Sequence, residues 1–565
     1  MSEPIVQVRD LTFRYRRATQ PAIRDISLAV GAGEIVLVAG PSGCGKSTLI
    51  RAINGLIPHA YPGELSGTVA VDGRLIAETR LRDLSAVIGT VLQDPAKQIV
   101  GATVEAEMAF GPENLGIERS EIRRRIQEVA DRAGIRALLG RETAGLSGGE
   151  RQLLAVAGIL MLQPRLYVVD EPLANLDPAS AARLLAILRA LADEGHAIVI
   201  VEHRVEEALD LRPDRVLYLE EGETRYLGDV DGFLAIADPD AVKLPFEAVL
   251  ARARQEAAPA SDLASANPLP TRPAMAAEGG PPRLVFADVR AGYGDHEVLH
   301  GIDASLGRRE VVAVLGPNGS GKTTLFRAAM RLLPTTSGAI LVDGQSIDKR
   351  TVAQLASTFG YVFQSPSQML FARTVREELT FGPRNLGRDP KTFEPIVAEA
   401  LRRTSLDQLE DILDRPPLTL SFGQQKRLAL AIALSLEPLT LILDEPSAGQ
   451  DYRTARRFMR EVMAIPGLES IYLVTHDVDL ALTHADRILL FRDGQVVADG
   501  PPALVVEDLD RWIACNLRPT SLMRANARWH RSGAGYLDAE SLAAHILASP
   551  GSGSREEGGS TVAAD

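Results

Sequence analysis

The sequence has few cysteines, no long apolar run and no excess of positive charge. Cys44 and Cys515 are its only cysteines, so we expect neither a disulfide framework nor a zinc site. No run of about 20 apolar residues occurs, and the N-terminus lacks the basic and apolar regions of a signal peptide. The formal net charge of −13 argues against broad binding to nucleic acid. These absences predict a cytoplasmic protein that reaches a membrane only through a partner.

A glycine-rich loop occurs twice in this 565-residue chain, at residues 40–47 and 316–323. Both copies fit G-x-x-x-x-G-K-[ST], each after a short apolar run and before a helix-compatible one. The glycines turn backbone N–H groups inward, the lysine reaches the outer phosphates of a nucleotide, and the last hydroxyl holds Mg²⁺. The residues predicted to bind ATP are Gly40, Ser42, Gly43, Gly45, Lys46, Ser47 and Thr48, and Gly316, Asn318, Gly319, Gly321, Lys322, Thr323 and Thr324.

The two loops belong to a longer repeat. Matching residues in the two halves are separated by 271 to 278 positions. Strands alternate with helices in each half, which predicts mainly parallel sheets. We expect a first domain at 1–240, a helix and Pro/Ala-rich linker at 241–282, a second domain at 283–502 and an extension at 503–565. The extension is predicted to be partly helical up to residue 548 and disordered after it.

Two carboxylates end a buried apolar strand in each half. These are Asp170 and Glu171 in the first half, and Asp444 and Glu445 in the second. Because neighbouring side chains on a strand diverge, the aspartate can address a metal while the glutamate addresses an attacking water. A histidine follows another apolar strand in each half (His203 and His476), and a glutamine follows a third (Gln93 and Gln364). The predicted catalytic residues are Glu171, His203, Glu445 and His476, and the predicted metal ligands are Ser47, Gln93, Asp170, Thr323, Gln364 and Asp444.

Together these residues resemble the ATP-binding-cassette (ABC) ATPases. The most specific element is the signature at residues 146–150, which reads LSGGE. The resemblance implies two tandem P-loop domains, each an α/β unit with a mainly parallel sheet, a helical subdomain and an antiparallel β subdomain. It also implies adenine stacking on Tyr15 and Tyr293, and D-loops ending at Asp177 and Asp451.

The same resemblance implies a head-to-tail sandwich within the chain, in which the signature of one domain faces the phosphate loop of the other. Lys46 would share a site with Ser421 and Gly423, and Lys322 would share one with Ser147 and Gly149. The second signature departs from the family pattern because Phe422 replaces its first glycine, and Gln450 replaces the usual leucine of the second D-loop. We expect two hydrolytic sites of unequal character, with the asymmetry at the Lys46 site.

The segments after Gln93 and Gln364 resemble those of energy-coupling factor (ECF) importers. Both are similar to Q-x-P-x-x-Q followed by T-V-x-x-[DE]-[VL]-x-F-G-x-x-N, with one departure each, at Met108 in the first copy and at Met369 in the second. In that family the segment, called the Q-helix, forms a groove for a transmembrane T component, and a separate S component binds the solute. The candidates to meet arginines of the T component are Glu105, Glu107, Glu377 and Glu378; the alternative is that these residues only form a solvated helix face.

The resemblance therefore implies an ATPase on the cytoplasmic face of the membrane that powers uptake of a vitamin, metal ion or related solute. Two alternatives stay open. A translation factor of the ABC-F type also joins two cassettes, but it would need a long charged helical linker, whereas residues 257–282 are nearly uncharged. A fused ATPase of a sugar or peptide importer would lack the paired Q-helix segments.

Overall fold

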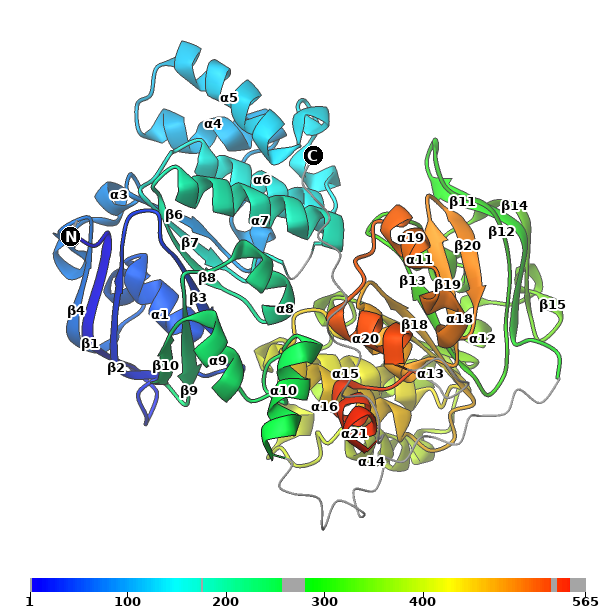
Figure 1. Ribbon diagram of the computed structural model, residues 1–565. Coiled ribbons are helices and arrows are strands. Elements are labelled where there is room, and N and C mark those ends of the chain that lie inside the picture. The colour runs from blue at the N-terminus through cyan, green and yellow to red at the C-terminus, as the bar shows by residue number, and fades with distance from the viewer. Residues whose placement is uncertain (1–2, 174–175, 257–279, 530–535, 549–565) are drawn as a thin grey trace.

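The computed structural model describes residues 3–173, 176–256, 280–529 and 536–548. The predicted tail at 549–565, and all of the predicted linker except residues 280–282, lie outside these ranges. Two α/β domains lie side by side, and helices of the extension lie where they meet (Figure 1). We call them the N domain and the C domain. No helix among the described residues is long and apolar enough to cross a membrane.

The core of the N domain is a six-stranded sheet in the order β10-β9-β3-β8-β7-β6. Its strands are parallel except for β10, and every residue of β3, β7 and β8 is buried. Such continuous apolar runs are typical of a sheet covered on both faces. The strands are β3 (Ile35–Ala39), β6 (Ile88–Val91), β7 (Leu166–Asp170), β8 (Ala197–Val201), β9 (Arg215–Glu220) and β10 (Glu223–Gly228).

A second, antiparallel sheet of the N domain has the order β2-β1-β4-β5 and shares an apolar core with the first. It consists of β1 (Val6–Tyr15), β2 (Ile23–Val30), β4 (Gly63–Val71) and β5 (Arg74–Leu75). Helices α4, α5 and α6 form a subdomain with a core of its own. The helices are α1 (Lys46–Ile53), α2 (Leu56–His59), α3 (Leu81–Leu84), α4 (Val104–Asn114), α5 (Arg119–Ala133), α6 (Gly148–Leu160), α7 (Pro178–Asp193), α8 (Val205–Ala208), α9 (Val230–Ile236) and α10 (Phe246–Glu256).

The C domain repeats this plan. Its sheets have the orders β16-β17-β18-β13-β19-β20 and β12-β11-β14-β15. The strands are β11 (Leu284–Tyr293), β12 (His296–Leu306), β13 (Val311–Leu315), β14 (Thr335–Val342), β15 (Gln345–Ser346), β16 (Phe359–Val362), β17 (Thr440–Asp444), β18 (Ser470–Thr475), β19 (Arg487–Arg492) and β20 (Gln495–Gly500). The helices are α11 (Lys322–Ala329), α12 (Val352–Ala356), α13 (Val375–Asn385), α14 (Phe393–Arg403), α15 (Phe422–Ser435), α16 (Tyr452–Met463) and α17 (Val478–His484). The predicted fold class, with its helical and antiparallel subdomains, is confirmed.

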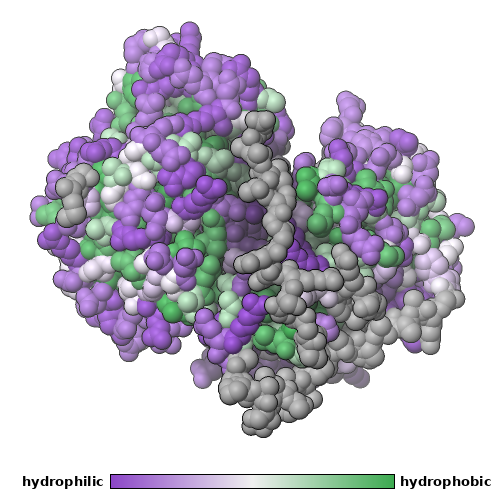
Figure 2. All heavy atoms as spheres, viewed as in Figure 1, coloured by the Kyte–Doolittle hydropathy of each residue, from purple (hydrophilic) through white to green (hydrophobic). Residues whose placement is uncertain are grey.

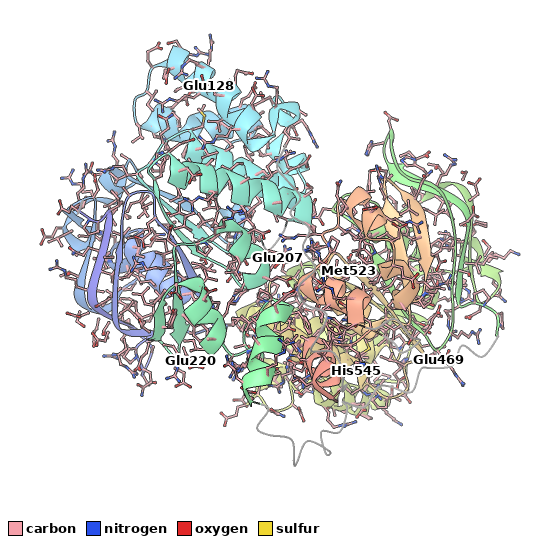
Figure 3. All side chains as sticks on the ribbon, in the orientation of Figure 1. Glu128, Glu207, Glu220, Glu469, Met523 and His545 are labelled. Atoms are coloured by element: carbon pink, nitrogen blue, oxygen red, sulfur yellow. The ribbon has the colours of Figure 1, made fainter. Side chains whose placement is uncertain are left out.

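The extension connects the two domains. It contains α18 (Pro502–Val506), α19 (Leu509–Ala514), α20 (Ser521–Trp529) and α21 (Ala539–Ala548), which confirms its predicted partial helicity. Trp512 is fully buried in the core of the C domain. Helices α20 and α21 instead pack against α10 of the N-terminal half, around Phe246, Leu522 and Leu542. Figure 3 labels Met523 of α20 and Glu207 of α8 in the middle of the molecule, and the N–H of Ser521, at the start of α20, donates to Glu206 of α8 at 2.8 Å. On the face of the molecule that Figure 2 shows, hydrophilic residues predominate and hydrophobic residues are scattered among them.

Candidate functional site

The first phosphate loop is a tight turn between β3 and α1. Helix α1 begins at Lys46, directly after Gly45, whose φ of +102° lies in the left-handed region. A Cβ atom at Gly45 would fall 2.5 Å from the Ile23 side chain, so only glycine fits. The buried Lys46 donates from Nζ to the carbonyl oxygens of Gly40 and Pro41, both at 2.8 Å. The loop thus holds a buried ammonium group, which suits the charge of a nucleotide phosphate.

The second loop has the same local geometry. Gly321 also has a φ of +102°, and α11 begins at Lys322. The Lys322 ammonium donates to the carbonyl oxygens of Gly316 at 2.8 Å and Pro317 at 2.9 Å. In both copies the predicted loop residues therefore lie together between a buried strand and the first turn of a helix.

The predicted carboxylates lie beside these loops. Asp170 ends β7 and Asp444 ends β17, and the glutamate after each has a φ of +48°. All four carboxylates are buried. The Lys46 ammonium acts electrostatically on both Asp170 and Glu171, so this pair belongs to the first loop. Thr323 donates to Asp444 Oδ1 at 3.1 Å, which joins the second pair to the second loop.

The aspartates have the character of Mg²⁺ ligands. Asp170 Oδ1 is buried and has no hydrogen-bond partner. Burial and the charge of Glu171 raise the pKa of Asp170 to about 6, and burial and Glu445 do the same for Asp444. A bound Mg²⁺ would satisfy these oxygens and stabilise their ionised form. A hydroxyl and one carboxylate per site fit the few protein ligands that Mg²⁺ takes beside phosphate and water.

The predicted histidines pair with the glutamates. His203 Nε2 lies 2.9 Å from Glu171 Oε1, and His476 Nδ1 lies 2.9 Å from Glu445 Oε1. Burial raises the pKa of each glutamate, but the neighbouring histidine and phosphate-loop lysine outweigh it, so the pKa of Glu171 is lowered and that of Glu445 falls to about 2. Each glutamate is therefore anionic at neutral pH.

The two predicted glutamines differ in their surroundings. Gln93 and Gln364 both have exposed side chains, but Gln93 donates from Nε2 to Glu171 Oε2 at 2.7 Å, whereas the bonds to the Glu445 carboxylate come from Thr475 and His476. Sequence reasoning missed two residues that serve the second site instead. Tyr361 donates to Asp444 Oδ2 at 2.8 Å, and Thr475 donates to Glu445 Oε2 at 3.1 Å. Both lie on buried strands, where their residue types look like ordinary core.

The predicted adenine-stacking tyrosines flank the helices that follow the loops. Tyr15 is half-buried against Phe13, and its hydroxyl lies 3.2 Å from Thr48 Oγ1. Tyr293 is 46% exposed and accepts a hydrogen bond from Arg327. Each hydroxyl thus contacts the helix that follows its phosphate loop, and the stacking of adenine on these rings stays a prediction.

Both signature serines are helix N-caps. Ser147 and Ser421 each form a capping box, with Glu150 and Gln424 respectively. The Phe422 departure leaves this cap intact. Gly149 and Gly423 come two residues after these serines, in the first turn of each helix, where free backbone N–H groups favour an anion.

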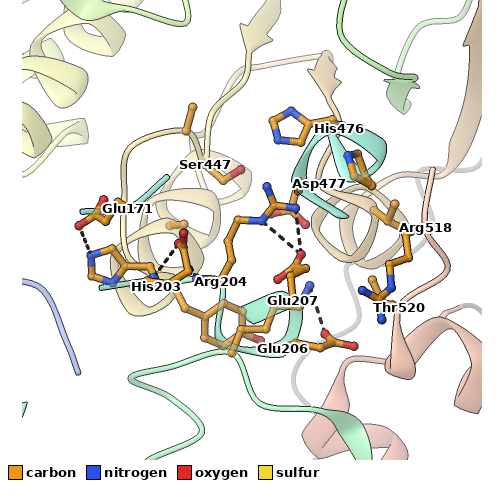
Figure 4. Close-up of a pocket in the computed structure, with 18 of the residues that line it drawn as sticks. Glu171, His203, Arg204, Glu206, Glu207, Ser447, His476, Asp477, Arg518 and Thr520 are labelled. Carbon is orange, nitrogen blue, oxygen red and sulfur yellow. Dashed lines mark hydrogen bonds and ion pairs between the residues drawn. The ribbon is translucent and has the colours of Figure 1, made fainter. Parts of the chain in front are cut away.

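Residues of both domains line a cavity of about 130 Å³ at the domain contact (Figure 4). Glu171 and His203 line it from the N domain, and residues 447–450 of the second D-loop line it from the C domain. In the other direction, the negative charge of Asp177 acts on Lys322. The second D-loop thus shares this cavity with Glu171 and His203, and the end of the first D-loop acts electrostatically on the phosphate-loop lysine of the C domain.

The four acidic residues of the Q-helix segments divide into two kinds. Glu107 and Glu378 are buried, and each carboxylate accepts two backbone N–H groups of the preceding loop. They cannot meet a partner's arginines, because they hold the loop against the helix. Glu105 and Glu377 are exposed at the start of α4 and α13.

The raised pKa of Asp170 predicts that Asp170→Asn stabilises the protein without nucleotide and Mg²⁺. The folded-state pKa of about 6 lies above the unfolded value of about 3.9, so the favourable contribution of Asp170 is full below about pH 4 and lost as pH rises through 6. The neutral variant should gain about 2 kcal/mol at pH 7.5, measured by denaturant unfolding in EDTA. MgATP should stabilise wild type but hardly the variant. An unchanged or lower stability in EDTA at pH 7.5 would contradict the assignment.

Comparison with known proteins agrees with this geometry. The family model described as "ABC transporter" matches residues 23–174 and 299–448, once in each domain. A protein of Methanosarcina acetivorans is 34% identical over 550 residues, which cover 92% of this chain and 89% of that protein. One of Enterococcus faecalis is 34% identical over 546 residues (92% and 95%), and one of Caldanaerobacter subterraneus is 32% identical over 569 residues (96% and 99%). The names of all three describe ABC transporter ATP-binding proteins.

A solved structure is similar to part of the chain. It is titled cbiO1 from Clostridium perfringens, part of the ABC transporter complex cbiONQ, and is 34% identical. The match covers 42% of this chain and 96% of that chain, with a TM-score of 0.37. The family matches in both domains and the full-length relatives lead to one conclusion: the chain belongs to the ABC transporter ATP-binding family, whose members hydrolyse ATP, and it carries two ATPase domains in tandem.

Proposed function

We propose that the protein is the ATPase subunit of an ECF-type importer, bound to the cytoplasmic face of the membrane through a T component. An S component, reached only through the T component, would select the vitamin, metal ion or related solute. The proposal is carried by one observation: both domains expose an apolar surface at the same positions of their Q-helix segments.

This surface, the Q-helix patch, is made of Val100 and Phe110 in the N domain, and Phe371 and Phe381 in the C domain. These side chains are 63%, 51%, 65% and 46% exposed. The Phe371 and Phe381 rings contact each other at 4.8 Å between centroids. Large apolar residues exposed in a group mark a docking surface more often than a bare solvent face. Two matching patches suit a partner with two similar helices.

The loops of the patch are held in place from below. Glu107 accepts the N–H groups of Val100 and Gly101 at 2.8 and 2.6 Å, and Glu378 does the same for the loop at Phe371. The exposed Glu105 and Glu377 add negative charge beside the apolar residues. An apolar centre with an acidic rim fits a partner helix that carries apolar side chains and arginines.

At the ATP sites, the chain's residues have separable tasks. The phosphate loop with Lys46 or Lys322 binds the phosphates, and Ser47 with Asp170, or Thr323 with Asp444, would hold Mg²⁺, which neutralises developing charge on the phosphates. Glu171 and Glu445 are anionic and can accept a proton from an attacking water. His203 and His476 hold these glutamates in place and can donate to the γ-phosphate.

The docking proposal is tested with Phe110→Asp/Phe381→Asp in the full chain, co-expressed with the membrane proteins encoded by neighbouring reading frames. Burying two carboxylates in an apolar contact should lower co-purification at least tenfold, with ATP binding unchanged. Leu504→Asp, at an apolar side chain 63% exposed on α18, is the matched control and should co-purify normally. Equal co-purification of both variants would reject the patch. Capture by ribosomes would favour a translation factor, and assembly with a sugar or peptide permease would favour that class.

Reversing charge with Glu105→Arg/Glu377→Arg should weaken the same assembly about tenfold, and more at low salt. Glu128→Arg, at an exposed glutamate on α5, is the control. Salt titration of the co-purified complex measures the effect. A complex that is insensitive both to the reversal and to salt would remove Glu105 and Glu377 from the interface.

A further inference from the structure

The D-loop of the C domain (residues 447–451, D-loop 2) is attached to its own signature helix, α15. Lys426 on α15 is buried, and its Nζ donates to the carbonyl oxygens of Glu445, Pro446 and Ala448 at 3.3, 2.5 and 2.8 Å. These bonds join α15 to the strand end and to D-loop 2.

Phe422 adds a second contact between the same two elements. A Cβ atom at Gly449 would fall 2.9 Å from the Phe422 ring, so the ring lies against the D-loop at Gly449, although it stays 43% exposed. The Lys426 ammonium lies 5.8 Å from the centre of that ring. The unusual signature residue is therefore part of a packed unit that contains Ser421 and D-loop 2.

Among the described residues, which leave out 174–175, the N domain shows no such attachment. Gln152 occupies the position that matches Lys426 and is fully buried, yet neither atom of its amide group has a hydrogen-bond partner. Gly148 occupies the position of Phe422 and offers no ring. The signature helix α6 therefore does not hold its D-loop (residues 173–177, D-loop 1) through these two positions.

D-loop 1 is attached to a different element, the segment that follows β8 and contains His203. Glu202 is buried and accepts the backbone N–H of Leu173 at 3.1 Å. Arg204 donates to the carbonyl oxygens of Leu173 and Leu176 at 2.9 and 3.2 Å. Both charged residues thus hold the described part of D-loop 1 beside His203.

The C domain has no such charged pair. Thr475 and Asp477 occupy the positions of Glu202 and Arg204. Thr475 donates to Glu445, and Asp477 caps α17 by accepting the N–H of Leu480. The two domains have therefore exchanged anchors: D-loop 1 is held by the histidine segment, and D-loop 2 by the signature helix.

Both anchoring elements belong to the same ATP site. His203 lies in the Lys46 site, and the signature with Ser421 is the one assigned to complete that site. D-loop 2 lines the same cavity as Glu171 and His203, and the negative charge of Asp177, at the end of D-loop 1, acts on Lys322. Figure 4 shows Glu171, His203 and Arg204 on one side of the cavity and Ser447 and Asp477 on the other.

We propose that Lys426 and the Glu202–Arg204 pair are positioning residues with different tasks. Lys426 delivers D-loop 2 and Ser421 together to the Lys46 site, and Glu202 with Arg204 links D-loop 1, and so the Lys322 site, to the histidine segment of the Lys46 site. Turnover at the Lys322 site then depends on the state of the Lys46 site through an attachment that has no counterpart in the other direction. A one-way effect between two sites is possible for turnover rates, whereas the effects of two sites on each other's binding affinity must be equal. The proposal rests on the shared ATP sites described above.

The test measures each site alone in the full chain. Glu445→Gln leaves hydrolysis to the Lys46 site, and Glu171→Gln leaves it to the Lys322 site. Lys426→Gln, which installs the residue of the N domain, should lower kcat about tenfold in the Glu445→Gln background and less than about threefold in the Glu171→Gln background. Glu202→Thr, which installs the residue of the C domain, should lower kcat about tenfold in the Glu171→Gln background.

Affinity for a fluorescent ATP analogue separates positioning from general damage. Neither Lys426→Gln nor Glu202→Thr should change this affinity more than about twofold, because the phosphate loops are intact. If the two residues only stabilised the fold, the variants would lower nucleotide affinity, thermal stability and turnover at both ATP sites together. Gln152→Lys, the reverse exchange, is the matched control for a buried lysine on a signature helix. The proposal would be overturned if one variant lowered kcat equally in both backgrounds, or if Lys426→Gln and Glu202→Thr lowered kcat in the same background. If Glu171→Gln and Glu445→Gln leave turnover unchanged, the site assignment itself is wrong.

Discussion

Replacing Glu445 by Gln lowers ATP turnover at the Lys322 site by about 10²- to 10³-fold, and Glu171→Gln does the same at the Lys46 site. Each glutamate combines an anionic state at neutral pH with an orientation that its histidine partner fixes. The pKa of Glu445 is about 2, because His476 and Lys322 outweigh the effect of burial. Gln keeps the shape and the hydrogen bond to the histidine, but it cannot take a proton from water.

The neighbouring aspartates cannot substitute for the glutamates. Their pKa of about 6 leaves them ionised at neutral pH, but Asp444 is already engaged by Thr323 and Tyr361. Asp170 lies in the matching position beside Lys46. An aspartate that holds the metal cannot also be positioned to take a proton from the attacking water.

Phosphate release under saturating ATP measures the loss, and titration with a fluorescent ATP analogue measures binding. Each single variant should still hydrolyse ATP at its intact site and should bind ATP as wild type does. The double variant should bind two nucleotides and hydrolyse almost none. Wild-type turnover in the double variant would show that Glu171 and Glu445 are not the proton acceptors.

The two histidines differ in the way that they contact the catalytic glutamates. In the structure they face the glutamates through different ring nitrogens, Nε2 in His203 and Nδ1 in His476. The two rings are therefore oriented differently at equivalent positions.

Local sequence predicted much of the fold and of each half-site. The apolar strands β7 and β17 end at the aspartates because their five residues are uniformly buried in a parallel sheet. The phosphate loops are predictable because they need glycine at positions with a left-handed backbone, such as Gly45 and Gly321. Such features depend on residues close together in the chain, so a pattern of a few positions is enough to predict them.

Contacts between distant segments could not be predicted in this way. Charge alone could not separate Glu105 from Glu107, because only packing decides which side of α4 faces the preceding loop. Lys426 looks like a surface lysine on a polar helix turn, yet it is 1% exposed. Its partners lie on another element, about 20 residues along the chain.

The strongest of these long-range contacts surrounds Lys243, between the two domains. Its Nζ lies 2.7 Å from Asp479 Oδ2 on the C domain and 3.6 Å from Glu206 Oε2 on the N domain. The two carboxylates occupy equivalent positions, three residues after His476 and His203, so one lysine pairs with a carboxylate from each half of the repeat. The extension closes over them, because Thr520 donates to Asp479 and the N–H of Ser521 donates to Glu206.

Lys243→Met should destabilise this contact by about 3–5 kcal/mol, the cost of leaving buried charges without their partner. Methionine fills the space of the lysine stem but leaves two carboxylates facing each other. Burial and the charge of Asp479 already raise the pKa of Glu206, and loss of Lys243 removes the group that opposes them. A folded-state pKa above the unfolded value means that stability is lost as pH rises through it. The variant should therefore regain stability as pH falls from 7 to 5.

Denaturant unfolding of the full chain at pH 7.5 and pH 5 measures both effects. The matched control is the triple variant Lys243→Met/Glu206→Gln/Asp479→Asn, which keeps the acceptors for Ser521 and Thr520 but carries no charge. It should be much closer to wild type than Lys243→Met alone and show little of its pH dependence, because replacing a whole buried ionic group costs far less than breaking it. A triple variant as unstable as the single one would mean that Lys243 acts by packing, and the charge of the two equivalent carboxylates would then have no part in joining the domains.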